Sequence, residues 1–355
     1  MLQIRFLQTG GWNLGSPVVG LSDSPDWLSR TAASAVRQSI HNVFQTAVAA
    51  GCHFVLATDR LASRENFPAA AAWLKPRIAN WRRQGVRLLV AGHQPDEWPT
   101  LESLGAVVVR EDRVVYVSLA DGEVICGEHA HSGSLLLDCH GHRLAVLQAS
   151  GILSCSARAV SGGTPAESLL RCGEVMSGKG RLQLATGSPQ GVSGSESGAG
   201  CCAIVTADFV RGELTAQGYS PQVLQFVSAK EECASGTTLP QLLKRLAERH
   251  RNLPSGRAVR LVDWEITGRL RFSLQDDASL RESNLLDVLR GLCNAGHSGS
   301  WPYRLRFSED CVVEVCERSS RLVAGILGTA AAARGLVPGS GSGVLELLHQ
   351  LQRAA

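Results

Sequence analysis

Three short apolar segments alternate with two helical patterns in the first 94 residues of the chain. The periodicity predicts strands at Leu2–Leu7, Phe54–Ala57 and Val86–Val90, and helices over residues 28–50 and 67–84. A crossover of helical length joins parallel strands, whereas antiparallel neighbours can be joined by a tight turn. The βαβαβ order therefore predicts a largely parallel sheet in an α/β fold. Loops at the carboxyl ends of such strands are the expected place for a functional site.

The rest of the chain predicts a different organisation. After residue 106 the chain reads as short strands and turns, and near residue 220 the pattern changes again to a small α+β module. We expect a large α/β domain at 1–220, this module at 221–308 and a helical tail at 309–355. The module's predicted elements are a helix at Leu239–His250, a hairpin of Val259–Ile266 and Leu270–Leu274 turning at Thr267-Gly268, a helix at Leu280–Leu292 and a strand at Tyr303–Phe307.

Composition narrows the cellular setting. The net charge is only +3, so nucleic-acid binding would need a local basic patch. Eleven cysteines at irregular spacing, behind a start that lacks a signal-peptide pattern, predict mostly free thiols in a reducing cytoplasm. No stretch reaches the roughly 20 apolar residues of a membrane span, and we expect no membrane association.

Glycine-rich or polar segments follow the predicted strands. They read Leu7-Gln-Thr-Gly-Gly-Trp-Asn-Leu-Gly15, Leu56-Ala-Thr-Asp59 and Val90-Ala-Gly-His-Gln94, and a later Gly187-Ser-Pro-Gln-Gly191 precedes Glu196. In order and spacing these segments resemble the calcineurin-like metallophosphoesterases, and specifically the SbcD-type DNA repair exonuclease subunits. The resemblance implies a four-layer αββα sandwich at 1–220, a capping domain at 221–308 and a partner of the SMC-like ATPase type.

Family members of this type hydrolyse phosphodiesters with two metal ions held by Asp, His and Asn side chains. The resemblance assigns eight positions of this chain to the former metal site: Gly11, Asn13, Asp59, His93, Gln94, Gln148, Glu174 and Met176. Of these, Asp59 matches its expected ligand, and His93 and Glu174 could still coordinate a metal. Glycine and methionine cannot replace oxygen or imidazole ligands of a hard divalent ion. The resemblance therefore implies a degenerate site with no bound cofactor.

Two readings of function follow. The first is a DNA-repair-related binding or scaffold subunit without catalysis, which contacts an SMC-like ATPase through the C-terminal helices, and DNA or a second copy of itself elsewhere. The second is a divergent exonuclease or phosphodiesterase that uses a single Mn²⁺ or similar ion at Asp59 and His93, with Glu174 as a further ligand. A structural interpretation of Asp59 is a cap that hydrogen-bonds its own loop.

A Cys/His-rich segment offers a third reading, a zinc-stabilised structural protein. Two β-hairpin strands could bring His129 and His131 near His140 and His142, although the spacing matches no standard zinc module. The metal-binding residue types of the segment are Cys126, Glu128, His129, His131, Asp138, Cys139, His140 and His142.

A basic run in the small module is the candidate DNA contact. Its alternative interpretation is a solvated helix face. The run consists of Lys244, Arg245, Arg249, Arg251, Arg257 and Arg260, and Arg77, Arg82, Arg83 and Arg87 could extend such a surface.

Overall fold

The structure is a computed structural model of the whole chain. It describes residues 3–21, 24–57, 60–91, 96–109, 115–118, 124–130, 134–139, 142–149, 152–156, 176–178, 181–185, 187–196, 202–208, 213–253, 256–272, 285–293, 299–309 and 311–315. The chain divides into two compact units, residues 1–224 and 225–355, and each is described by itself. The predicted tail helices lie outside the described residues.

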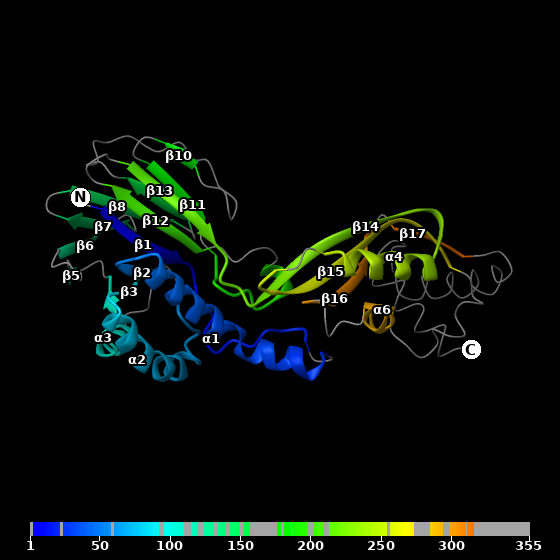
Figure 1. Cartoon of the computed structure of the whole chain (residues 1–355), viewed down its shortest axis with the longest axis horizontal. Coiled ribbons are helices and arrows are strands. Elements are labelled where there is room, and N and C mark those ends of the chain that lie inside the picture. The colour runs from blue at the N-terminus through cyan, green and yellow to red at the C-terminus, as the bar shows by residue number, and fades with distance from the viewer. Residues whose placement is uncertain are drawn as a thin grey trace. The chain divides into compact units, whose positions relative to one another are not determined.

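The first unit is built on a six-stranded sheet with the order β13-β12-β1-β2-β3-β4 (Figure 1). Neighbours from β1 to β4 run parallel, as the βαβαβ pattern predicted, while β12 is antiparallel to both β1 and β13. Because β1 lies between β12 and β2, the first strand of the chain is interior. The strands are β1 (Gln3–Thr9), β2 (Phe54–Ala57), β3 (Arg87–Val90), β4 (Val107–Val108), β12 (Cys202–Asp208) and β13 (Glu213–Tyr219).

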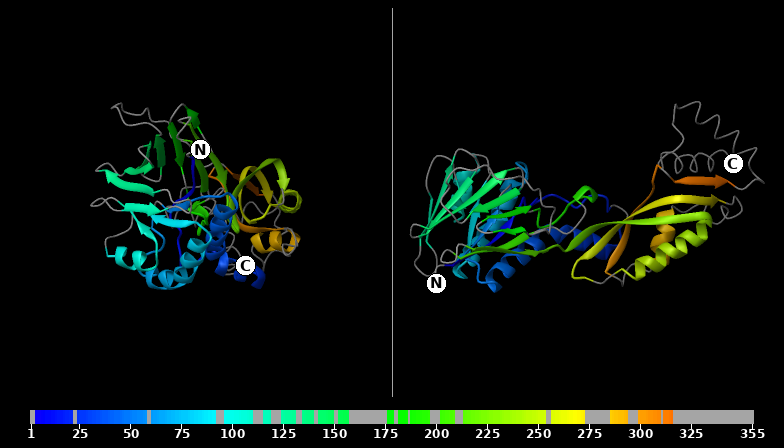
Figure 2. Two further views of the ribbon diagram at one scale, coloured as in Figure 1. Left: turned by 60° about the vertical axis from the view of Figure 1, so that its left-hand side comes forward. Right: turned by 90° about the horizontal axis from the view of Figure 1, so that it is seen from above.

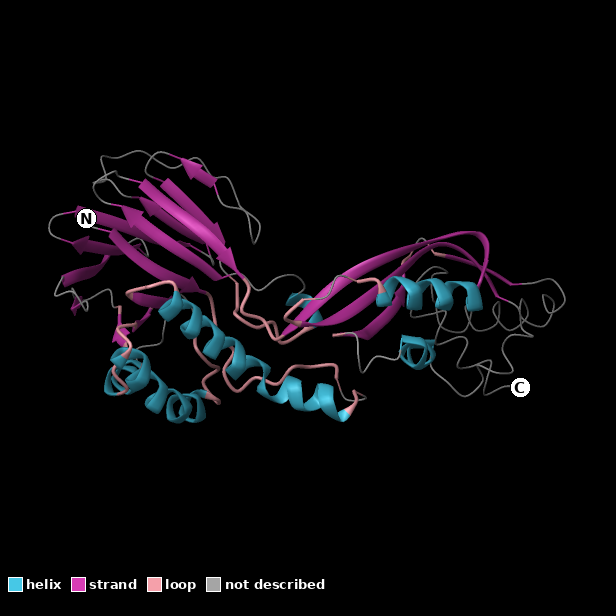
Figure 3. Cartoon of the chain, in the orientation of Figure 1, coloured by secondary structure: helices cyan, strands magenta, loops and turns pink. Residues whose placement is uncertain are grey.

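Helices α1 (Asp26–Ala49) and α2 (Phe67–Arg83) cover one face of this sheet (Figure 3). Their apolar faces meet where the rings of Phe44 and Trp81 stack at 3.4 Å between centroids. Gly51 follows α1 at a φ of 65°, a left-handed conformation that glycine adopts without strain, and it ends the helix as predicted. A short helix, α3 (Trp98–Ser103), precedes β4.

A second, seven-stranded sheet completes the first unit, with the order β10-β11-β9-β8-β7-β6-β5. Edge strand β10 and its neighbour β11 contact β13, and the other edge strand β5 contacts β4, so the two sheets meet along both edges and form an αββ arrangement. A further helical layer, as in a four-layer sandwich, is not among the described residues. The strands are β5 (Val115–Ser118), β6 (Val124–Ala130), β7 (Ser134–Cys139), β8 (His142–Ala149), β9 (Ile152–Ser156), β10 (Met176–Gly178) and β11 (Arg181–Ala185).

The second unit is a mixed α/β module, seen from above in Figure 2. Its sheet has the order β14-β15-β16, and β17 also pairs with β15. Both β16 and β17 run parallel to β15, and α4 and α6 pack against each other and against the sheet. The elements are β14 (Leu224–Thr238), α4 (Leu239–Arg251), β15 (Val259–Phe272), α6 (Leu285–Cys293), β16 (Ser300–Phe307) and β17 (Val312–Val315). The predicted helix Leu239–His250 and the predicted strand Tyr303–Phe307 are confirmed, and α6 confirms the described part of the predicted helix Leu280–Leu292.

The predicted hairpin at Thr267-Gly268 is wrong. Strand β15 continues through both residues to Phe272. Gly268 has a φ of +89°, and a Cβ atom at this position would lie 2.2 Å from the backbone oxygen of Cys233 on β14. The glycine therefore permits a close approach of two backbones, a role that glycine takes inside strands as well as in turns.

The described helices include none that combines the length and the apolar character needed to cross a membrane.

Candidate functional site

The loops after β1 and β2 meet the segment around Gly187 at the carboxyl edge of the first sheet. Gly10 donates its backbone N–H to the oxygen of Gly187 at 3.0 Å, and Trp12 donates to the oxygen of Arg60 at the same distance. Leu14 donates to the oxygen of Leu61 at 2.9 Å. Three segments that are far apart in the sequence thus form one hydrogen-bonded edge, where the sequence predicted a site.

Side chains of the first loop serve mainly to hold its shape. Trp12 is fully buried, and its indole Nε1 donates to Thr9 Oγ1 at 2.7 Å. The Trp12 ring also packs edge-on against Phe44, 5.9 Å between centroids. Gly15, with a φ of 85°, lies so close to Asn66 that a Cβ atom would be 2.8 Å from its side chain. A larger residue at position 15 would push the first loop away from the loop after β2.

Asn13 is the polar residue that this loop presents. Its φ of 52° is left-handed, a conformation that asparagine tolerates better than most residues. The Asn13 carboxamide donates from Nδ2 to Ser188 Oγ at 3.3 Å, and Ser188 in turn donates to the Gln190 oxygen at 2.8 Å. Asn13 and Ser188 therefore form a neutral contact at a position that the resemblance assigned to the former metal site.

Gln190 has a structural role that the sequence did not reveal. The side chain is fully buried, and Oε1 accepts the backbone N–H groups of Val223 at 2.9 Å and Leu224 at 3.1 Å. Its Nε2 donates to the oxygens of Gly191 at 2.9 Å and Leu224 at 2.7 Å. One amide thus satisfies four backbone groups and fixes the chain at the start of β14.

The described residues that meet at this edge do not supply the donor set of a two-metal centre. Within residues 10–16, 60–62 and 187–191 there is no carboxylate, imidazole or thiol. Across the described part of the chain, no three His, Cys, Asp or Glu side chains gather in a way that could hold a metal ion. Gly11 and Asn13 lie within the described residues, and neither has the carboxylate or imidazole expected of a metal ligand.

Of the other predicted site positions, two are described by their backbones alone and four are not described. The backbones of Gln148 and Met176 lie in strands β8 and β10 of the second sheet, paired with Leu153 and Gln183. Four positions lie outside the described residues: Asp59, His93, Gln94 and Glu174.

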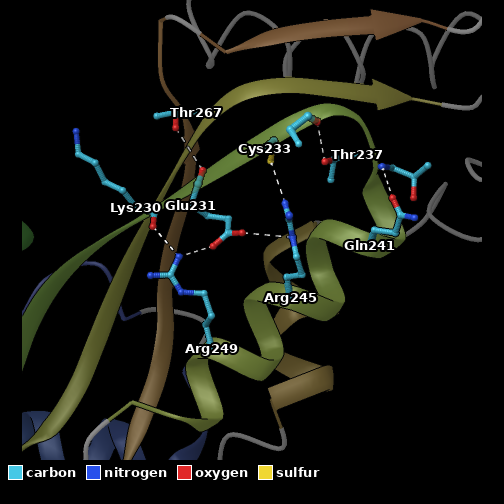
Figure 4. Close-up of polar contacts among 10 residues, drawn as sticks. Lys230, Glu231, Cys233, Thr237, Gln241, Arg245, Arg249 and Thr267 are labelled. Atoms are coloured by element: carbon cyan, nitrogen blue, oxygen red, sulfur yellow. Dashed lines mark hydrogen bonds and ion pairs between the residues drawn. The ribbon is translucent and has the colours of Figure 1, made fainter.

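The basic run of the second unit is partly neutralised. Arg245 and Arg249 on α4 both form ion pairs with Glu231 on β14, and the Arg245 Nε to Glu231 Oε1 distance is 3.3 Å (Figure 4). The Glu231 side chain is only 7% exposed, whereas the two arginines are 40% and 54% exposed. Arg249 also donates to the backbone oxygen of Lys230 at 2.9 Å.

Among the described residues, the remaining members of the basic run form no such ion pair with a buried carboxylate. Lys244, Arg251 and Arg257 are exposed, and Arg260 is half-buried. The Arg251 Nε donates to the oxygen of Ala247 at 3.2 Å, a contact within the helix. Glu231 was missed as their neighbour because no strand was predicted over residues 224–238.

Two buried groups of the second unit have shifted pKa values. Burial lowers the pKa of His250, although its Nε2 lies 2.9 Å from Ser300 Oγ. Burial also raises the pKa of Asp263, against the opposing effect of the nearby Arg306 and Arg304 guanidinium groups. His250 is only 1% exposed, so its side chain is part of the core and cannot contact a substrate.

The described parts of the Cys/His-rich segment lie on β6, β7 and β8, and the register of these strands separates two of the histidines. His129 on β6 pairs with Leu135 and His142 on β8 pairs with Cys139. These partners are four residues apart on β7, about 13 Å at the rise of a strand. His131 and His140 lie outside the described residues, and a zinc site here stays a prediction.

No protein-family model matches the chain, and no curated protein matches its sequence.

Proposed function

We propose that the chain is a catalytically inactive relative of the SbcD-type metallophosphoesterases that works as a binding or scaffold subunit. Its partner would be an SMC-like ATPase in a DNA-repair complex. The parallel sheet and the convergence of strand-end loops on its carboxyl edge support this proposal, because they are the setting in which such enzymes hold their metals. We also propose that a second helical layer completes a four-layer sandwich.

One observation carries the proposal. Residues 10–16, 60–62 and 187–191, which meet at the carboxyl edge, contain no carboxylate, imidazole or thiol, and Asn13 is engaged with Ser188. Two divalent ions need several such ligands, and usually a carboxylate that bridges them. A single retained ligand such as Asp59 cannot replace that set. The loops have kept their backbone arrangement and now serve architecture or binding.

A Mn²⁺-dependent nuclease and phosphodiesterase assay on the purified full chain tests the loss of catalysis. We expect no turnover above the background of an Asp59→Ala variant, and no Mn²⁺-induced rise in the unfolding temperature. Turnover or Mn²⁺ stabilisation that disappears in Asp59→Ala and His93→Ala would establish the alternative, a divergent single-metal enzyme. A control substitution Ser195→Ala, at an exposed residue in the same part of the chain, should change neither measurement.

The scaffold role is tested separately by binding to an SMC-like ATPase encoded in the same genome. We expect the full chain to co-purify with the ATPase, and a chain that ends at Val315 to lose this association. A truncated chain that binds as well as the full chain would contradict a role for the C-terminal tail. Failure of the full chain to bind would contradict the scaffold role itself.

A further inference from the structure

The charged residues of helix α2 are all basic. Between Phe67 and Val90 the chain has five basic residues and no acidic one. The basic residues are Lys75, Arg77, Arg82, Arg83 and Arg87. This segment differs from the basic run of the second unit, where a buried carboxylate neutralises two of the cations.

The geometry of a helix places three of these cations on one flank of α2. Lys75, Arg82 and Arg83 are exposed, and they follow the i, i+7, i+8 spacing that shares a face. The seven residues from Lys75 to Arg82 span about 10.5 Å along the axis. Ala79 lies between them, and its small side chain leaves room for a partner to approach the cations closely.

The buried side of α2 fixes this orientation. Leu74, Ile78 and Trp81 face the core, and Trp81 stacks on Phe44 of α1. On the other flank, Arg77 lies 4.0 Å over the ring of Trp73 and donates to its backbone oxygen at 2.7 Å. Arg77 is therefore occupied, and the flank of Lys75, Arg82 and Arg83 is the one that offers free cations.

These cations have no ion-pair partner within the part of the chain that the structure describes. Lys75, Arg82, Arg83 and Arg87 appear in no salt bridge there. Arg82 and Arg83 lie in the last turn of α2, where their positive charges also interact favourably with the helix dipole. That role does not account for Lys75, two turns earlier, or for Arg87 at the start of β3.

We propose that Lys75, Arg82 and Arg83, here called the α2 surface, bind the phosphate backbone of duplex nucleic acid. Two of the three are arginines, whose planar guanidinium matches phosphate oxygens in a bidentate way. Contacts of this kind position a protein on a duplex without reading its sequence. This inference rests on the proposed function for its partner class, and it places the main DNA contact on α2 instead of the basic run of the second unit.

Salt dependence gives the sharpest test, because each phosphate contact contributes about 0.9 to the slope of log K against log salt. The protein is the full chain and the probe is a fluorescent duplex DNA, titrated between about 50 and 200 mM salt. We expect the variant Lys75→Gln/Arg82→Gln/Arg83→Gln to reduce the magnitude of the slope by about 2.7. At the upper salt concentration this variant should bind more weakly than wild type.

Two controls separate charge at this surface from other causes. The variant Lys75→Arg/Arg82→Lys/Arg83→Lys keeps every charge and should keep the salt slope. The variant Lys244→Gln/Arg251→Gln/Arg257→Gln removes three exposed cations from the second unit and should change the slope less. All substitutions are at exposed positions and should alter the free energy of unfolding by no more than about 0.5 kcal/mol.

Three outcomes would overturn the inference. The α2 variant could keep the wild-type slope while the second-unit variant loses it, which would leave the proposed DNA role intact and move it to the other unit. An acidic polyglutamate peptide could bind more tightly than duplex DNA, which would identify a protein partner. The wild-type chain could fail to bind duplex DNA even at the lowest salt. None of these results depends on the nuclease assay, so failure of the inference and catalytic activity are distinguishable.

Discussion

Gln190 permits a prediction whose size follows directly from its hydrogen bonds. Substitution Gln190→Met keeps the length and volume of the side chain but removes all four bonds to Gly191, Val223 and Leu224. A buried hydrogen bond contributes about 1 kcal/mol net, so the variant should lose about 4 kcal/mol. If the segment opens locally, amide exchange at Val223 and Leu224 should accelerate by roughly 10³-fold, because each tenfold corresponds to 1.4 kcal/mol.

A second substitution at the same position adds a pH signature. In Gln190→Glu, the carboxylate can still accept from Val223 and Leu224, but only the protonated acid can donate to the Leu224 oxygen. The folded-state pKa of this carboxyl should therefore exceed its unfolded value of about 4.3. Stability is then fully present below the unfolded pKa and is lost as the pH rises through the folded pKa. The penalty relative to wild type should grow between about pH 4 and 7.

The matched control is Gln38→Met on α1, where an exposed amide bonds only to Asn42. Its effect on unfolding in urea should stay within about 0.5 kcal/mol. The reasoning is refuted if Gln190→Met costs less than about 1 kcal/mol and Gln190→Glu shows the pH profile of wild type. Exchange at Val223 and Leu224 that matches wild type would contradict the clamp independently of global unfolding.

Three further predictions concern the second unit. Gly268→Ala should cost several times more stability than Gly236→Ala, because both have a left-handed φ but only the first Cβ would meet backbone, and urea unfolding compares them. The lowered pKa of His250 predicts that stability falls as the pH drops below about 6.5, by up to about 1.4 kcal/mol per pH unit until the folded pKa is reached; a His250→Gln variant measured against pH should lack this loss. Glu231→Gln should lower the thermal midpoint by more than Glu232→Gln, since only Glu231 is buried between two arginines, and equal effects would contradict a stabilising role of that ion-pair cluster.

The first unit was the easier part to predict because its signals are local. The apolar spacing of α1 and α2 and the glycine at position 51 place the helices within a few residues of their observed bounds. The short apolar runs of β2 and β3 likewise follow from composition alone. Where local pattern and tertiary contact agree, sequence periodicity is sufficient.

The second unit shows where local signals fail. Strand β14 was missed because it includes Lys230, Glu231 and Glu232, so its outward face is polar and its inward face holds a carboxylate. The turn signal at Gly268 was misread because its cause is a contact with Cys233, which is 35 residues earlier in the chain. Both errors arise from partners that only the folded chain brings together.

The same limit applies to the candidate site. The position of the strand-end loops and the bland chemistry of Gly11 and Asn13 could be predicted from the sequence. The neutral contact between Asn13 and Ser188, and the clamp at Gln190, could not, because each joins segments separated by tens of residues or more.

The interior place of β1 has a consequence for the order in which the chain can fold. Gln3 pairs with Asp208, about 200 residues later, so β1 leaves the ribosome long before β12 is available to pair with it. At about 5–20 residues per second this delay is roughly 10–40 s. During that time one edge of β1 has no native partner, and unpaired edges promote association with other chains. Nascent chains of this protein should therefore depend on protection of β1 for much longer than chains whose neighbouring strands are close in sequence.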